Sequence, residues 1–271
     1  MKKNIRKATC PIFIHLQKYI HMSEKKIHNV GVVILAAGDG KRMKSTLPKM
    51  MHELKGKPLI QHVVEHVEQS GIGKPLIVVS PKHSMVQDCI GERAEYVVQK
   101  EQLGTGHAAS MAETILKGTV EHVIFLNGDM PFVSGVSIKR LLARHTERKN
   151  TITMMTVVVP NFENENQAFA GFGRIVRGIN GHIARIVEKK DATEEELGIL
   201  ELNPSVWCFE ASWLWKSLKN LKNENSQKEY YLTDLIGMGI DEGVQISSIS
   251  IEPKEAVGIN TAEDLEVAKG L

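Results

Sequence analysis

The sequence predicts an α/β protein built on a mixed, mainly parallel sheet that helices cover on both faces. In the first half of the chain, short apolar runs of strand length alternate with segments of helical period. The connections between the apolar runs are long enough for crossovers, which join successive strands in parallel. In the second half, two alternating segments flank residues 178–181 as a hairpin, which predicts a β-rich flap.

The individual elements follow in chain order. Residues 32–36 form a buried apolar strand, and Pro58 and Gly71 suit the first turn and the end of the next helix. Further strands are expected at 76–79, 96–99, 123–126, 152–159, 206–209 and 244–251. Further helices are expected at 83–90, 105–116, 212–221, 231–241 and 261–269, the last capped by Thr261.

Composition excludes several classes of protein. A chain of 271 residues with 42% hydrophobic and 24% charged residues and a net charge of +2 is unlike a nucleic-acid binder. Cys10, Cys89 and Cys208 form no CxxC pair, so neither a disulfide framework nor a zinc site is indicated. No apolar run approaches the roughly 18 residues that a membrane span needs. We therefore expect a cytoplasmic protein with no membrane span.

Residues 1–28 are basic and irregular, and they differ in character from the rest of the chain. They contain no small-residue cleavage pattern, so a signal peptide is not indicated. We expect this leader to be disordered or not native, with Met22 as the hypothetical natural start. Residues 29–271 are expected to form one folded domain.

The loop after the first strand has the character of an anion site. Gly38-Asp39-Gly40 has little bulk, so a ligand can lie against main-chain N–H groups. Nearby cations suit a triphosphate: Lys41, Arg42, Lys44 and Lys49. The dinucleotide pattern GxGxxG fails because Met43 takes the third glycine position, and GxxxxGK[ST] is absent. A simple sharp turn is the alternative interpretation.

Two later loops carry different chemistry. Gln99 and Gln102 offer amides that can read a base edge, although they could equally be surface polar residues. Asp129 follows a buried strand and suits Mg²⁺, which takes only one or two protein oxygens; a turn or helix cap is the alternative. Ligands of open α/β sheets bind at the carboxyl ends of the strands, so we expect the loops after residues 35, 98 and 126 to meet.

Several motifs together resemble one family, the bacterial N-acetylglucosamine-1-phosphate uridyltransferases. The motifs are LAAGDGKRMKSTLPKMMHELKGKPL, EQLGTGHA, GDMP, VEKKDA, EYYLTD and VGIN, and the resemblance covers roughly residues 30–271. It implies a Rossmann-like, GT-A-like nucleotide-diphosphosugar transferase fold in which the flap binds sugar. It further implies uridine triphosphate (UTP) and N-acetylglucosamine 1-phosphate as substrates and Mg²⁺ as cofactor.

The resemblance also implies roles for individual residues. Arg42 and Lys49 resemble the catalytic cations, and Asp129 and Asn260 the metal ligands. The residues implied in nucleotide binding are Leu35, Ala36, Ala37, Gly38, Gln99, Gln102, Gly104 and Thr105. Those implied in sugar binding are Gly173, Glu188, Asn203 and Thr233, although the charge run that begins at Glu188 could be a solvated face.

The chain departs from the family pattern at two places near the implied sugar site. Asn127 stands where the family usually has tyrosine, and Pro204-Ser205 where it has a small or hydroxyl residue and glycine. Two alternatives therefore stay open: a uridylyltransferase for another sugar 1-phosphate, and a catalytically weak regulatory protein that binds nucleotide sugars. No hexapeptide repeat is visible, so we expect no β-helix acetyltransferase domain. A homo-oligomer and a separate acetyltransferase partner stay open.

Overall fold

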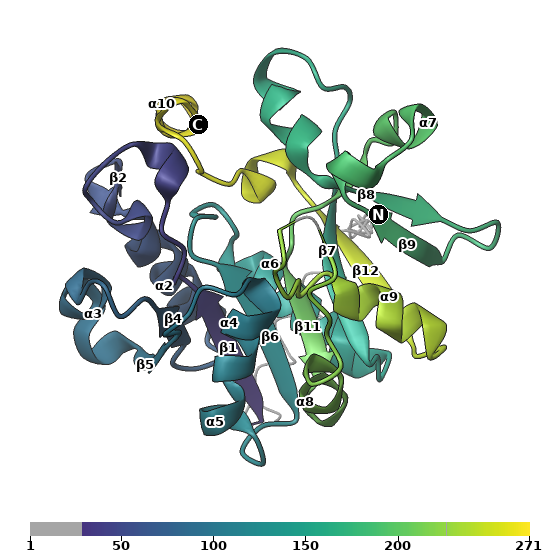
Figure 1. Ribbon diagram of the computed structural model, residues 1–271, viewed down its shortest axis with the longest axis horizontal. Coiled ribbons are helices and arrows are strands. Elements are labelled where there is room, and N and C mark those ends of the chain that lie inside the picture. The colour runs from purple at the N-terminus through teal and green to yellow at the C-terminus, as the bar shows by residue number, and fades with distance from the viewer. Residues whose placement is uncertain (1–28, 226) are drawn as a thin grey trace, which may run out of the picture.

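The computed structural model describes residues 29–225 and 227–271, which contain a ten-stranded mixed sheet (Figure 1). The strand order is β5-β4-β1-β6-β11-β7-β10-β8-β9, with β12 paired to β7. Only β11, β10 and β9 run against the common direction, so the predicted mainly parallel sheet is confirmed. The bounds are β1 Val30–Leu35, β4 Leu76–Val79, β5 Glu95–Val98, β6 His122–Asn127, β7 Ile152–Val158, β8 Gly173–Arg177, β9 Ile183–Val187, β10 Glu201–Asn203, β11 Trp207–Glu210 and β12 Ile246–Ile251.

Helices cover both faces of the sheet. Alternate residues of β1 point to opposite faces, so each set packs against a different group of helices. Val32 and Ile34 pack in one buried cluster with α2 (Leu59–Ser70), α3 (Met85–Ile90) and α6 (Gly135–Glu147). Val33 and Leu35 pack in a second cluster with α4, α8 and α9. These helices span α4 Thr105–Met111, α8 Ala211–Leu218 and α9 Asp234–Asp241. The strand is therefore buried on both faces, as its continuous apolar run predicts.

Helix α6 was missing from the expected elements. Ser134 caps it, because the Ser134 hydroxyl accepts from the Ser137 N–H over 3.1 Å. Its first residue, Gly135, lies so close to α2 that an added Cβ would stand 2.7 Å from the His66 carbonyl oxygen. Glycine is thus required where the two helices meet.

The single helix expected at 105–116 is instead two helices, α4 and α5 (Glu113–Leu116), separated at Ala112. At this break the Ala112 N–H donates over 3.1 Å to the Ala109 carbonyl, three residues back, as in a 3₁₀ turn. Further short elements are β2 Glu53–Leu54, β3 Lys57–Pro58 and α7 Glu194–Leu197. Within the described ranges, no helix is both long and apolar enough to span a bilayer.

The last helix, α10 (Ala262–Lys269), returns to the beginning of the described chain and lies beside β2 (Figure 1). Thr261 caps it in a capping box with Asp264, as the sequence predicts. A small buried cluster joins this C-terminal segment to the loop after β1: Met43, Leu54, Leu59, Ile259, Leu265 and Ala268. The C-terminal segment therefore packs beside the loop that follows the carboxyl end of β1.

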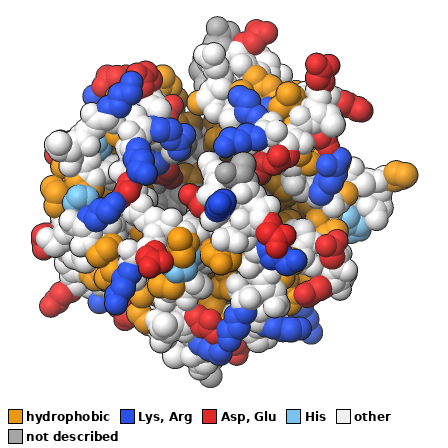
Figure 2. Space-filling model, in the orientation of Figure 1, with side chains coloured by type: hydrophobic (Ala, Val, Ile, Leu, Met, Phe, Trp, Pro, Cys, Tyr) orange, Lys and Arg blue, Asp and Glu red, His pale blue; other side chains and the backbone are white. Residues whose placement is uncertain are grey.

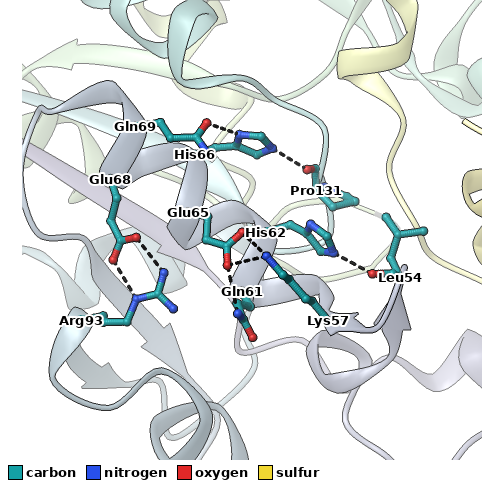
Figure 3. Close-up of polar contacts among 10 residues, drawn as sticks. All are labelled: Leu54, Lys57, Gln61, His62, Glu65, His66, Glu68, Gln69, Arg93 and Pro131. Atoms are coloured by element: carbon teal, nitrogen blue, oxygen red, sulfur yellow. Dashed lines mark hydrogen bonds and ion pairs between the residues drawn. The ribbon is translucent and has the colours of Figure 1, made fainter.

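Two histidines of helix α2 bond segments near the carboxyl ends of the parallel strands (Figure 3). The His66 Nε2–H donates to the Pro131 carbonyl over 3.1 Å, and the His62 Nε2–H donates to the Leu54 carbonyl over 2.8 Å. Pro131 lies two residues after Asp129, so α2 helps to position the loop that carries this carboxylate.

Candidate active site

The loops after β1, β5 and β6 meet, as the strand order requires for a site at the carboxyl ends of parallel strands. The Gln102 Nε2 donates to the Ala37 carbonyl over 2.6 Å and to the Asp39 Oδ1 over 2.8 Å. The Gly128 N–H donates to the Leu35 carbonyl over 3.0 Å. Figure 2 shows basic side chains around the hollow between the loop after β1 and the β8–β9 hairpin.

The loop after β1 folds tightly against Lys49. Gly40 has a φ of 62°, and an added Cβ would stand 2.5 Å from the Lys49 Cβ, so glycine is required there. Gly38 differs, because its backbone is not in the left-handed region and an added Cβ would meet nothing within 4 Å. Neither backbone conformation nor packing within the described chain requires glycine at 38. The open space beside it is where the sequence predicts a nucleotide.

Lys49 is the centre of a compact polar cluster. Its Nζ lies against the Asp129 carboxylate and donates to the Asn260 Oδ1 over 2.7 Å. Arg42 Nη2 donates to the same Asn260 oxygen over 2.9 Å. The Ile259 N–H bonds the Asp129 carbonyl over 2.9 Å, which brings Asn260 beside Asp129. The structure thus unites all four residues implied in catalysis and metal binding.

The same cluster contains two oxygen donors of the kind that Mg²⁺ binds. The Asp129 carboxylate and the Asn260 amide oxygen both face one cationic Nζ, so two hard oxygen ligands converge on a common point. Mg²⁺ keeps most of its waters and takes few protein ligands. It therefore does not need a larger cluster of acidic side chains. Among the described residues, no cluster of three or more His, Cys, Asp or Glu side chains could hold a metal ion.

A second ion pair, which the sequence did not predict, joins the same loop to the segment after β4. The Lys82 Nζ donates to both Asp39 carboxylate oxygens, over 2.7 and 2.8 Å. This hydrogen bond is the main reason that the Asp39 pKa lies below its usual value. An acidic residue in a predicted phosphate loop is thereby neutralised by a neighbouring cation.

The loop after β5 is rigidly supported by the chain near residue 230. Gly104 has a φ of 105°, and an added Cβ would stand 2.5 Å from the Tyr230 carbonyl oxygen. The Thr105 hydroxyl accepts from the Leu232 N–H over 3.0 Å. Gln99 is buried and its Nε2 donates to the Gly104 carbonyl over 3.2 Å, which orients its amide. The predicted base-reading residues therefore lie together, and Gln102 also holds the loop after β1.

The four residues implied in sugar binding lie around the flap. Asn203 of β10 pairs with Gly173 of β8. A Cβ added at Gly173 would stand 3.3 Å from the Glu188 Oε1, so the glycine and this carboxylate are neighbours. Thr233 precedes α9, whose first residue, Asp234, acts electrostatically on Glu188. Glu188 at the end of the flap and Asp234 at the start of α9 therefore form one acidic region.

Glu188 is electrostatically unusual. Glu188 is solvent-exposed, yet desolvation by its neighbours raises the pKa of its carboxyl, and the charges of Asp234 and Asp191 raise it further. Arg174 opposes the shift. Desolvation also raises the pKa of Asp234, which is likewise exposed. Two carboxylates that disfavour ionisation in the same region suit a ligand that supplies hydrogen-bond donors, as sugar hydroxyl and amide groups do.

Sequence comparison defines the chain as a nucleotidyltransferase and gives its family. A family model for the MobA-like NTP transferase domain matches residues 32–230. The chain belongs to this family.

The curated relatives are bifunctional GlmU proteins. The one from Exiguobacterium sp. is 38% identical over 240 residues, which are 88% of this chain and 52% of that protein. The one from Acetivibrio thermocellus is 41% identical over 237 residues, 87% of this chain and 50% of that protein. The chain spans about half the length of these relatives. The resemblance that the motifs predict is confirmed.

Solved structures of lower identity share the fold. A Bacillus anthracis protein named as a glucose-1-phosphate thymidylyltransferase, in complex with a sucrose, has a TM-score of 0.71 at 18% identity, with 89% of this chain and 94% of that chain covered. A CMP:2-keto-3-deoxy-manno-octonic acid synthetase complexed with CTP has a TM-score of 0.65 at 16% identity and covers 89% and 97%. The predicted GT-A-like α/β fold is confirmed.

Proposed function

We propose that the protein is a sugar nucleotidyltransferase that converts UTP and N-acetylglucosamine 1-phosphate to UDP-N-acetylglucosamine and pyrophosphate. The observation that carries this proposal is the cluster in which Lys49 bonds Asp129 and Asn260, with Arg42 on the same amide oxygen. In this proposal residues 29–271 form the nucleotidyltransferase domain. The enzyme acts in the cytoplasm, where nucleoside triphosphates are made.

In the proposed reaction a sugar-phosphate oxygen attacks the α-phosphorus of UTP in line. The bond from that phosphorus to the α,β-bridging oxygen breaks, and its electron pair leaves with pyrophosphate. The main difficulty is to bring two polyanions together in a reactive orientation. Lys49 lies between the α-phosphate and the sugar phosphate, and Arg42 binds the departing phosphates. Neither residue forms a covalent bond to the substrate.

Asp129 and Asn260 are the residues that would hold Mg²⁺, since their oxygens converge on one point. When bound there, the ion supplies charge stabilisation for the phosphates and orients them. Leu35, Ala36, Ala37 and Gly38 line the nucleotide in this proposal. The uracil is read by Gln99, Gln102, Gly104 and Thr105.

The sugar is held in this proposal by Gly173, Glu188, Asn203 and Thr233. Their arrangement around the flap supports one sugar site close to the phosphate cluster. A different sugar 1-phosphate is the second candidate, because Asn127 stands where the family usually has tyrosine and its Nδ2 bonds the Ser205 carbonyl, beside Asn203.

Pyrophosphate release by the purified protein tests the proposal. With Mg²⁺ and UTP, N-acetylglucosamine 1-phosphate is compared with the 1-phosphates of glucose, galactose, N-acetylgalactosamine and glucosamine. Preference for the first supports the proposal, and preference for another sugar supports the second candidate. Stabilisation of the fold by UDP-sugars without turnover on any sugar would indicate a binding protein instead, because a ligand stabilises only the state that it binds.

A further inference from the structure

Asn127 connects the strand that leads to Asp129 with the turn that follows Asn203. It is the last residue of β6, and its Nδ2 donates to the Ser205 carbonyl over 3.1 Å. Ser205 lies between β10 and β11, where the chain leaves the flap. The two places where the chain departs from the family pattern are therefore in direct contact.

The turn at Ser205 requires support from its neighbours. With a φ of 60°, Ser205 occupies the left-handed region that residues other than glycine, asparagine and aspartate rarely adopt. Pro204 before it has no N–H to contribute. Both main-chain groups of Ser205 are bound by side chains, since its N–H donates to the Asn203 Oδ1 over 2.9 Å and its carbonyl accepts from Asn127.

This support fixes the amide of Asn203. Because the Asn203 Oδ1 accepts from Ser205, the orientation of its Nδ2 is determined by the position of the turn. The Asn203 side chain is buried, and its Nδ2 lies 3.5 Å from the Ser205 hydroxyl, at the limit of a hydrogen bond. This donor therefore remains available to an acceptor beside Gly173, with which Asn203 pairs.

We propose that Asn127 is a positioning residue for the sugar 1-phosphate. It holds the Ser205 turn, the turn orients the Asn203 amide, and that amide contacts the sugar. The proposal rests on the proposed function. It assigns to Asn127 an effect on the sugar substrate that is separate from nucleotide binding, because Asn127 bonds the turn and none of the residues proposed to contact UTP.

Steady-state kinetics of Asn127→Ala test this proposal. The KM for the preferred sugar 1-phosphate is expected to rise about 5- to 10-fold, the range that one lost neutral hydrogen bond gives, with the KM for UTP within about twofold of wild type. Asn220→Ala is the matched control, because Asn220 also donates to a carbonyl, that of Lys216, on the exposed end of α8. It is expected to change neither KM.

Two further variants separate positioning from general stability. Asn127→Asp keeps the shape of the side chain but has no N–H donor, so it must raise the sugar KM as Asn127→Ala does. Ser205→Gly keeps both main-chain bonds and suits a positive φ, so alone it should leave the sugar KM within about twofold. Combined with Asn127→Ala it should raise that KM beyond the single variant, because glycine lets an unheld turn open.

Equal shifts of both KM values, or no shift of the sugar KM, would overturn the proposal. Unfolding of both Asn127 variants would also overturn it, since the residue would then have a purely structural role. If the wild type releases no pyrophosphate with any sugar, the proposed function fails on its own. Calorimetric affinity for UDP-N-acetylglucosamine then decides, with a 5- to 10-fold loss in Asn127→Ala expected and an unchanged affinity contradicting the inference.

Discussion

Lys49 and Asn260 belong to opposite ends of the described chain, yet the Lys49 Nζ donates to the Asn260 Oδ1 over 2.7 Å. This contact exists because α10 packs against the loop after β1 and because the Ile259 N–H bonds the Asp129 carbonyl. The proposed catalytic cluster is therefore assembled by tertiary structure. Its residues are held by neighbours that take no part in the chemistry.

Removing a charge from this cluster should abolish most turnover. Asp129→Ala and Arg42→Ala are each expected to lower kcat at least about 100-fold, the scale of a lost electrostatic contact to a transition state. Arg148→Ala, at an exposed position after α6, is the control and should retain full kcat. Near-normal turnover in Asp129→Ala or Arg42→Ala would remove that residue from the mechanism.

Gly38 tests the position of the nucleotide. Gly38→Ala should fold at least as stably as the wild type, because an added Cβ there meets nothing within 4 Å. Its KM for UTP should nevertheless rise at least about tenfold if the triphosphate lies against this backbone. Gly237→Ala, in α9, has equally open space and is the matched control. An unchanged KM for UTP in Gly38→Ala would place the nucleotide elsewhere.

Glu188 is expected to lower stability at neutral pH while it serves sugar binding. Its raised folded-state pKa means that the protonated carboxyl is the better tolerated form, so stability is fully present at low pH and part of it is lost as pH rises through the folded value. Glu188→Gln should therefore raise the unfolding midpoint at pH 7, with a smaller gain near pH 4. Its KM for the sugar 1-phosphate should rise about tenfold.

Glu224→Gln, at an exposed position, is the control for Glu188→Gln. It should alter neither the unfolding midpoint nor the KM for the sugar 1-phosphate. A Glu188→Gln protein that is less stable than wild type at pH 7 would contradict the account.

A buried histidine, remote from the proposed site, should govern acid stability. The pKa of His145 lies at about 3 instead of 6.5, chiefly because of burial and also because of the charge of His122, while Glu210 opposes the shift. The unfolded chain thus binds the proton more tightly, and stability is lost as pH falls from about 6.5 towards about 3. His145→Gln should show a flatter decline in unfolding midpoint over this window. His83→Gln, at an exposed position, should follow the wild type.

An equal decline in His145→Gln and wild type would assign acid unfolding to other groups. The ring nitrogens of His145 contact the Thr153 hydroxyl over 2.9 Å and the His122 Nδ1 over 3.2 Å.

The sequence predicted those elements whose signals are local. The apolar run of β1 and the Thr261 cap of α10 are examples, since each needs only adjacent residues. The interruption at Ala112 was not predicted, because the helical period of the apolar residues does not reveal where the main-chain bonding changes to a 3₁₀ turn. Helix α6 could have been found from the Ser134 cap and the spacing of Ile138, Leu141 and His145.

For the site, the sequence predicted that the loops after residues 35, 98 and 126 meet, and the structure brings them together. The Asp39–Lys82 ion pair and the Asn127–Ser205 bond lay beyond it. Each contact joins residues that are far apart in the chain. The sequence around one residue of the pair does not indicate which distant residue it contacts.

The most direct test of the central claim follows UTP labelled at the α-phosphate with N-acetylglucosamine 1-phosphate and Mg²⁺. We expect the label to move into UDP-N-acetylglucosamine with one pyrophosphate released per label transferred, and Asp129→Ala to reduce this transfer at least about 100-fold. Label that stays in UTP with every sugar 1-phosphate, or transfer that survives Asp129→Ala, would contradict it.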